Sequence, residues 1–176
     1  MRPVFALVLF ALPALAHRGA PERTLRLQIR GGAIEGLLSL RLPPGHAARR
    51  LLAVPPGLLP GDGGTLEERL GRRAAPDALR GLKAGMGEAR PLRASEAKAR
   101  RTPTGGIEAM LLVGVEGAPD GIFVLEAESG ARVKAILAAP GHRLDLIEGL
   151  GRPGRSGLEL RPRPGRRCRV RIGPPR

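Results

Sequence analysis

A repeated alternation of apolar and polar side chains, with a period of two residues, most constrains how this chain folds. It is clearest at residues 24–30 and 34–42, where leucine or isoleucine recurs at alternate positions. Successive side chains of a strand point to opposite faces, so this pattern predicts two strands with one buried face each. Gly31 and Gly32 lie between them and predict a tight hairpin turn.

The same alternation recurs along most of the chain, in short segments bounded by glycine, proline or aspartate. About eight or nine strands at spacings of about 10 residues predict a mainly β fold. We expect an antiparallel β-sandwich, either immunoglobulin-like or barrel-like. The further strands are predicted at residues 91–101, 107–115, 121–126, 132–138, 143–147, 157–161 and 167–172.

A central segment breaks this pattern. Residues 43–64 are rich in proline and glycine and predict a long connection, with a short helical turn at residues 46–52. Thr65 and Glu68 then have the spacing of a capping box, in which each side chain accepts a hydrogen bond from a backbone N–H at the helix start. We expect a helix from Thr65 to about Ala74.

Pro76 is expected to end that helix, because proline lacks a backbone N–H and its ring clashes with the preceding turn. Asp77 would then cap a second short helix that runs through Leu82. The helical insertion is therefore predicted at about residues 65–86.

The start of the chain has the composition of a secretory signal peptide. An apolar run at residues 4–12 is followed by Ala14 and Ala16, the small residues of a cleavage site. The alternative is a membrane anchor, but that requires about 20 apolar residues. We predict a signal-peptide helix at residues 1–16 and a secreted or periplasmic product, residues 17–176, without a transmembrane segment.

The predicted mature chain is long enough for one domain with a substantial core. We divide it into a β-domain at residues 17–151 and an arginine-rich segment of strands and tail at residues 152–176. Cys168 is the only cysteine, so the chain can form no intramolecular disulfide. Its position in an alternating strand predicts a small core residue, with pairing between two chains as the alternative.

The net charge of +14 is concentrated near the C-terminus, where residues 152–176 hold nine arginines and one glutamate. Such a stripe on an exported protein predicts binding to an anionic surface of the cell envelope or to an acidic protein. Nucleic acid is not expected, because stacking aromatic residues are missing. An alternative is a strand edge whose arginines prevent aggregation. The candidate binding residues are Arg161, Arg163, Arg166, Arg167, Arg169 and Arg171.

Processing would create a candidate metal site. Cleavage after Ala16 places His17 at the N-terminus, where its α-amine and imidazole can together chelate Cu(II). The other candidate ligands are His46 and His142, each of which follows a Pro-Gly pair. The arrangement resembles the N-terminal histidine site of periplasmic copper carriers and copper oxygenases. The alternative interpretation is two histidines in turns and a third at a chain end.

Catalytic signatures are weak throughout the sequence. No Gly-x-Ser-x-Gly motif accompanies the four serines. Gly149, Gly151 and Gly154 match the spacing of a dinucleotide-binding loop, but that loop requires a helix directly after it, and this segment predicts a turn before a strand. We therefore predict a non-enzymatic binding or structural protein, with a copper-binding protein as the alternative.

Several segments resemble the exported β-rich domain that precedes the membrane part of hydrogenase and urease accessory proteins, and its stand-alone relatives. They are the start at residues 14–17, the hairpin at 25–42, the helical insertion ending near Gly85, TGGIEAMLL at 104–112 and PGHRLDLI at 140–147. The resemblance implies the architecture and the compartment rather than an activity.

Overall fold

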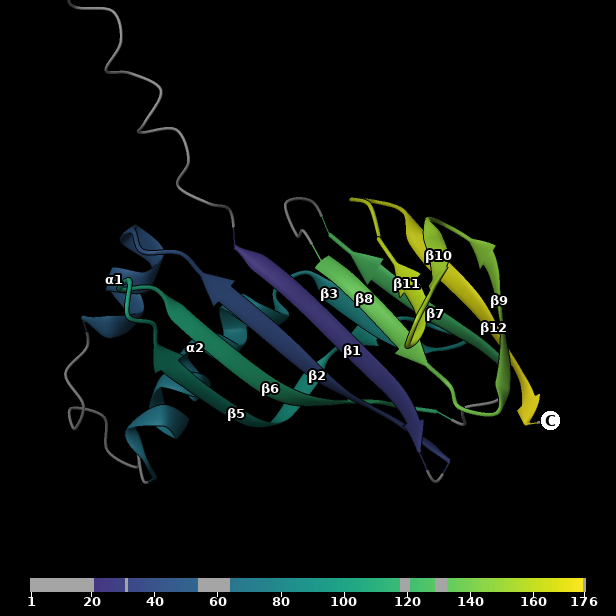
Figure 1. Cartoon of the computed structure of the whole chain (residues 1–176), viewed down its shortest axis with the longest axis horizontal. Helices are drawn as coiled ribbons and strands as arrows, with labels where there is room; N and C mark the ends of the chain where they lie inside the picture. Colours follow the sequence, from purple (N-terminus) through teal and green to yellow (C-terminus); the bar gives the residue numbers. More distant parts are fainter. Residues whose placement is uncertain (1–20, 31, 54–63, 118–120, 129–132, 176) are drawn as a thin grey trace, which may run out of the picture.

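The protein is mainly β, with two helices and two sheets in the part that the computed structural model describes (Figure 1). The predicted signal peptide lies outside the described residues. None of the described helices combines the length and the apolar composition that a membrane span requires. The described residues are 21–30, 32–53, 64–117, 121–128 and 133–175.

The larger sheet has seven strands in the order β10-β11-β8-β1-β2-β6-β5. Its neighbouring strands are antiparallel, as predicted, except that β1 and β8 run parallel. This pair differs because the chain reaches β8 by crossing over from the other sheet rather than through a hairpin. The bounds are β1 Glu22–Arg30, β2 Ala33–Leu42, β5 Arg93–Arg101, β6 Ile107–Val115, β8 Val133–Ala138, β10 Gly151–Gly154 and β11 Gly157–Leu160.

The predicted hairpin is confirmed. β1 and β2 pair along their whole length, from Glu22 opposite Arg41 to Arg30 opposite Ala33. Gly32 has a φ of 83°, a left-handed conformation that glycine adopts without steric penalty. The hairpin therefore places the predicted apolar positions of both strands on one face.

The smaller sheet has five strands in the order β4-β3-β7-β12-β9. β12 lies between β7 and β9, so the interpretation of the arginine-rich strand as a sheet edge is wrong. Its alternation is as predicted: Cys168 is buried in the core and the flanking arginines point away from it. The bounds are β3 Leu82–Met86, β4 Arg90–Pro91, β7 Gly121–Ala127, β9 His142–Glu148 and β12 Arg167–Pro175.

Both helices precede β3 in the chain. α1 spans His46–Leu52, which matches the predicted helical turn, and α2 spans Leu66–Leu79. The capping box is confirmed: the Glu68 backbone N–H donates to the Thr65 hydroxyl over 3.2 Å, and the Thr65 N–H donates to the Glu68 carboxylate over 2.9 Å. This pair fixes where α2 begins.

The predicted end of α2 is wrong. Pro76 lies inside the helix, and Asp77 caps no second helix but forms ion pairs with Arg50 and Arg80 at 3.3 and 2.7 Å. Burial of Ala78 beyond the proline keeps this last turn helical. Residues 82–86, predicted as part of the helical insertion, form β3 instead.

Two strand predictions also change in the structure. The single strand expected at residues 91–101 is divided into β4 and β5, which belong to different sheets. The glycine-rich turn at residues 149–154 includes β10, which pairs with β11 from Gly151 opposite Leu160 to Gly154 opposite Gly157. A hairpin partner decides the structure here, because so short a segment carries no clear alternation of its own.

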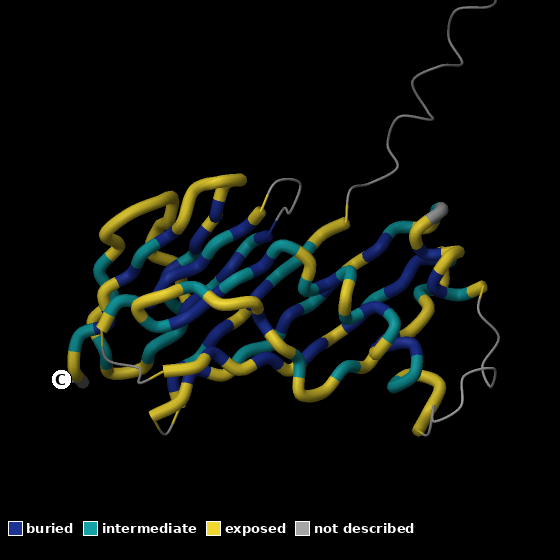
Figure 2. Tube along the Cα trace, turned by 180° about the vertical axis from the view of Figure 1, so that it is seen from behind, coloured by how far each residue is buried: buried dark blue, intermediate teal, exposed yellow. Residues whose placement is uncertain are grey.

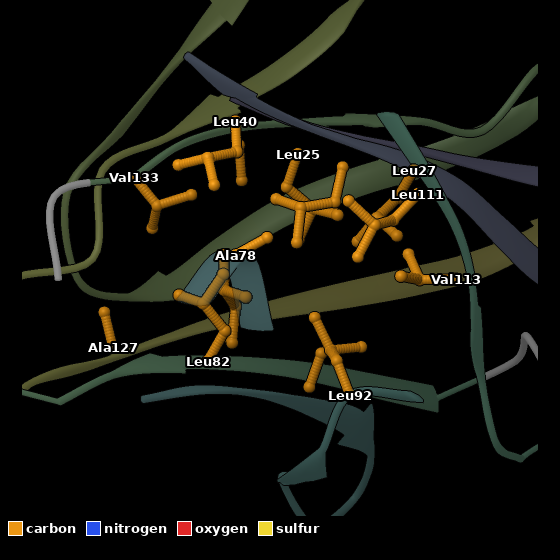
Figure 3. Packing of buried hydrophobic residues seen from close by; sticks show 14 of the residues in the cluster. Leu25, Leu27, Leu40, Ala78, Leu82, Leu92, Leu111, Val113, Ala127 and Val133 are labelled. Atoms are coloured by element: carbon orange, nitrogen blue, oxygen red, sulfur yellow. The ribbon is translucent and has the colours of Figure 1, made fainter. Parts of the chain in front are cut away.

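The facing sides of the two sheets bury one continuous hydrophobic cluster. Figure 2 shows buried positions recurring along the strands and exposed positions in the turns. In Figure 3, Leu25 from β1 and Leu82 from β3 point into the same cluster as Ala78 of α2. The five-stranded sheet thus covers one part of the larger sheet, and α2 packs against its β5 side.

Candidate functional site

A cleft of about 820 Å³ lies at the end of the smaller sheet where β12 begins. Three stretches of chain converge there: the end of β7, the connection between β9 and β10, and the connection between β11 and β12 (upper margin of Figure 1). Four of the six predicted arginines line it, namely Arg161, Arg163, Arg166 and Arg167. The structure therefore gathers most of the predicted basic stripe around one concavity.

A tight turn presents three of these arginines. The backbone N–H of Arg166 donates to the Arg163 carbonyl over 2.9 Å, and Gly165 within the turn has a φ of 70°. Arg161 is held at the other side of the connection, where its N–H donates to the Leu150 carbonyl over 2.9 Å. Backbone hydrogen bonds thus fix the connection and leave the guanidinium groups exposed.

Three glutamates share the cleft, but the strand framework already gives them basic neighbours. Glu148 forms an ion pair with Arg167 at 3.3 Å, and Glu128 forms one with Lys83 at 3.0 Å. Glu126 lies opposite Arg167 and Lys83 in the register of the sheet. The acidic groups are therefore balanced by cations on β3 and β12.

The remaining basic side chains carry the unbalanced charge. Among the described residues, no ion pair joins Arg161, Arg163 or Arg166 to an acidic side chain. Exposed guanidinium groups with five N–H donors each suit carboxylate and phosphate oxygens. The cleft is therefore chemically matched to an anionic group that enters from solvent.

The last two predicted arginines lie outside the cleft, further along β12. Arg169 forms a 3.7 Å ion pair with Glu148, and only 33% of its side chain is exposed. Arg171 lies opposite Asp145 of β9 and is exposed. These two residues extend the basic stripe over the outer face of the smaller sheet without contributing to the concavity.

Cys168 forms part of the cleft wall, but its side chain points into the core and is 1% exposed. Its thiol donates to the Leu150 carbonyl over 3.7 Å. Burial raises the pKa of the Cys168 thiol, so the group stays protonated at neutral pH. The cysteine therefore has a packing role here, in agreement with its predicted position.

The candidate copper ligands are separated in the fold. α1, which begins at His46, and β9, which begins at His142, lie at opposite ends of the molecule in Figure 1. His142 is held locally, with its Nδ1 3.1 Å from the Pro140 carbonyl oxygen. His17 lies outside the described residues, so its pairing with either histidine stays a prediction, and the described part contains no group of three metal-binding side chains.

Comparisons with protein-family models, with curated proteins and with solved structures each found no match to this chain. The resemblance to the exported domain of hydrogenase and urease accessory proteins therefore stays a prediction.

Sequence reasoning missed the acidic members of the cleft. Glu126 and Glu128 stand two residues apart and suggest only a solvated strand face. Their role follows from the pairing of β7 with β12, which brings Glu126 opposite Arg167. The available signal was the alternating acidic and basic segments, and it becomes useful only once the order of strands in the sheet is known.

Proposed function

We propose that this protein is an exported, non-enzymatic binding protein of the periplasm or cell envelope, and that its arginine-lined cleft binds an anionic partner. The observation that carries the proposal is the convergence of Arg161, Arg163 and Arg166 on one cleft without an acidic partner among the described residues. The ligand chemistry is a phosphate or carboxylate group, as presented by an acidic lipid headgroup or an acidic protein.

The framework of the site supports binding rather than catalysis. In the proposed form, the two sheets act as a β-sandwich, and the cleft lies at one end of it. Its basic groups are arginines, which stay charged at every physiological pH and do not transfer protons. Recognition of negative charge is the chemistry that such groups perform without a cofactor.

The compartment is a separate part of the proposal and rests on the composition of residues 1–16. Mass spectrometry of the protein purified from its native host tests it directly. The mature protein is expected to begin at His17. A polypeptide recovered only with residues 1–16 attached would contradict export through this signal peptide.

Vesicle binding tests the cleft. The protein is expected to bind vesicles that contain acidic phospholipid more tightly than neutral ones, and added salt should weaken the binding. Each arginine near an anionic surface contributes about 1 kcal/mol, so replacing three should weaken binding about 100-fold. The variant combines Arg161→Gln, Arg163→Gln and Arg166→Gln.

A matched control removes the same charge elsewhere. Arg49, Arg101 and Arg155 are exposed, lie outside the cleft and form no ion pair among the described residues. Their combined replacement by glutamine should change vesicle binding much less than the cleft variant does. Equal losses in the two variants would show a general charge effect and contradict a specific cleft. Binding to an acidic peptide but not to vesicles would assign a protein partner.

A further inference from the structure

Four neighbouring strands of the larger sheet, β1, β2, β6 and β5, present a broad outer face. The core lies on the other side of these strands, where α2 packs against β5 and β6 and where β3 contacts β6. Two large apolar side chains of β6 are exposed on this face: Met110 is 48% exposed and Leu112 is 45% exposed. Together with Leu37 of β2, which lies opposite Leu112, they form an apolar patch of the kind that contacts a partner.

The register of the strands arranges the charges of this face in rows. One row crosses the four strands as Glu22, Arg41, Glu108 and Arg100. Its signs are negative, positive, negative and positive. If a second copy of this row is laid over the first in the reverse strand order, every charge faces a charge of the opposite sign.

A second row has the same property around an apolar centre. It crosses the strands as Arg26, Leu37, Leu112 and Glu96, with the leucines on β2 and β6. Reversal again places a negative charge over the positive one and a leucine over a leucine. A partner with uniform charge would match neither row, whereas a reversed copy of the same rows matches both.

We propose that this face binds a second copy of the chain, sheet against sheet, around a two-fold axis parallel to the strands and between β2 and β6. Such an axis is the symmetry of an isologous dimer, in which both copies use the same patch. Leu37 then faces the partner's Leu112, and Arg26 faces the partner's Glu96. Two packed sheets keep their strands within about 30° of each other, so these pairings hold near the axis.

The two other rows are compatible with this arrangement. In the row of Thr24, Ser39, Met110 and Lys98, the exposed Met110 faces the partner's Ser39 and Lys98 faces the partner's Thr24. In the row that begins at Gln28, Glu35 faces a glycine of the partner. The rotation therefore opposes no two like charges in any of the four rows.

The size of the patch sets the expected affinity. Four strands about 4.8 Å apart and four rows about 6.6 Å apart cover roughly 500 Å² on each copy. The total of about 1,000 Å² is below the size of stable specific interfaces and in the range of weak, transient ones. We therefore expect a reversible dimer that forms at micromolar concentrations or above, with little dimer at nanomolar concentrations.

Sedimentation velocity tests the proposal by measuring the fraction of dimer at protein concentrations from about 1 to about 500 μM in one buffer. Arg26→Glu places two glutamates opposite each other twice in the dimer, and Glu96→Arg does the same with two arginines. Each variant alone is expected to weaken dimerisation at least tenfold. An equimolar mixture of the two should associate as tightly as the wild type, because both cross pairs are then of opposite sign.

This rescue distinguishes the dimer from a change within one molecule. Within a chain, Arg26 and Glu96 are three strand spacings apart, about 14 Å, which exceeds the distance over which exposed charges interact at physiological salt. Arg171→Glu, on the other sheet, makes the same change in charge and should leave dimerisation intact. A wild type that stays monomeric at the highest concentration, or a mixture no better than its components, would overturn the proposal, and circular dichroism checks that each variant is folded.

Discussion

The larger sheet is covered in two different ways, by α2 on its β5 side and by the smaller sheet elsewhere. The surface of α2 that enters the core consists of Leu70 and the three small residues Gly71, Ala74 and Ala78. The smaller sheet contributes larger side chains, including Phe123 and Leu125, both fully buried. The difference shows that side-chain size sets the distance between layers. A helix with mostly small buried residues packs close to the strands, whereas two sheets stand about 10 Å apart and need long side chains between them.

The largest expected effect comes from emptying the part of the core between the sheets. Phe123→Ala should lower the free energy of unfolding by about 3–5 kcal/mol, because it removes buried contacts and leaves a cavity. Thermal unfolding followed by far-ultraviolet circular dichroism measures this. Leu125→Ala in the fully buried part between the sheets and Leu70→Ala on α2 are a matched pair, and Leu70→Ala should have the smaller effect, since Leu70 is at the margin of the core with 8% exposure. Equal losses would contradict the difference between the two coverings.

The second prediction adds volume under the helix instead of removing it. A Cβ at Gly71 would collide with the backbone of Ala97 and Lys98, so Gly71→Ala should lower stability by about 1–3 kcal/mol despite the better helix propensity of alanine. Gly114→Ala is the control, because a Cβ there meets nothing within 4 Å. Urea denaturation should show no loss for this control. A neutral Gly71→Ala would mean that the close approach of α2 is not required.

A third prediction compares how often α2 and the smaller sheet each separate from the larger sheet in the folded protein. Cys168 reports on the sheet-covered part, and Ala78→Cys in a Cys168→Ala background reports on the helix-covered part; both positions are buried. Small residues bury less apolar area, so α2 should detach more readily than a strand from the middle of a sheet. Labelling with a thiol reagent should be about tenfold faster at position 78. Equal rates would indicate that both parts open in one cooperative step.

The smallest expected effect on stability comes from two surface glutamates, one in the part of the larger sheet covered by α2 and one in the part covered by the smaller sheet. Hydrogen bonds from Arg100 and Arg41 lower the pKa of Glu108, and hydrogen bonds from Lys134 and Arg152 lower the pKa of Glu159. A carboxylate with a lowered pKa stabilises the fold above the unfolded-state pKa of about 4.3, and this contribution is lost as the pH falls through the folded-state pKa.

Glu108→Gln and Glu159→Gln should therefore each flatten the acid side of the stability profile slightly. The effect should shrink in high salt, because both groups are on the surface. Urea titrations at a series of pH values and at low protein concentration, where the proposed dimer dissociates, give this profile. A greater loss of stability at neutral pH than at pH 3 is the expected sign, and the reverse would contradict the pKa shifts.

The local features of the fold could be predicted from sequence because their signals lie within a few residues. The hairpin of β1 and β2, the capping box at Thr65 and the alternation around Cys168 depend on neighbouring positions only. The errors concern interactions with distant residues. Pro76 stays helical because α2 is packed on the core, and residues 82–86 form a strand because β7 pairs with them.

For the candidate site, too, the local features could be predicted from sequence and the contacts between distant strands could not. The six arginines stood out from their density, and four of them line the cleft. That Glu126 and Glu148 would join them could not be predicted, because this depends on which strands flank β12. The parallel pairing of β1 with β8 has the same origin, since no local pattern specifies a partner across most of the chain.

The position of β12 has a consequence for how the protein is made. Every other described strand precedes it in the chain, yet β12 lies between β7 and β9. A ribosome that has not yet passed Pro175 therefore holds a polypeptide whose smaller sheet lacks the strand that joins β7 to β9. β9 can therefore complete its pairing only at the end of translation, and the smaller sheet is the last part of the fold to form.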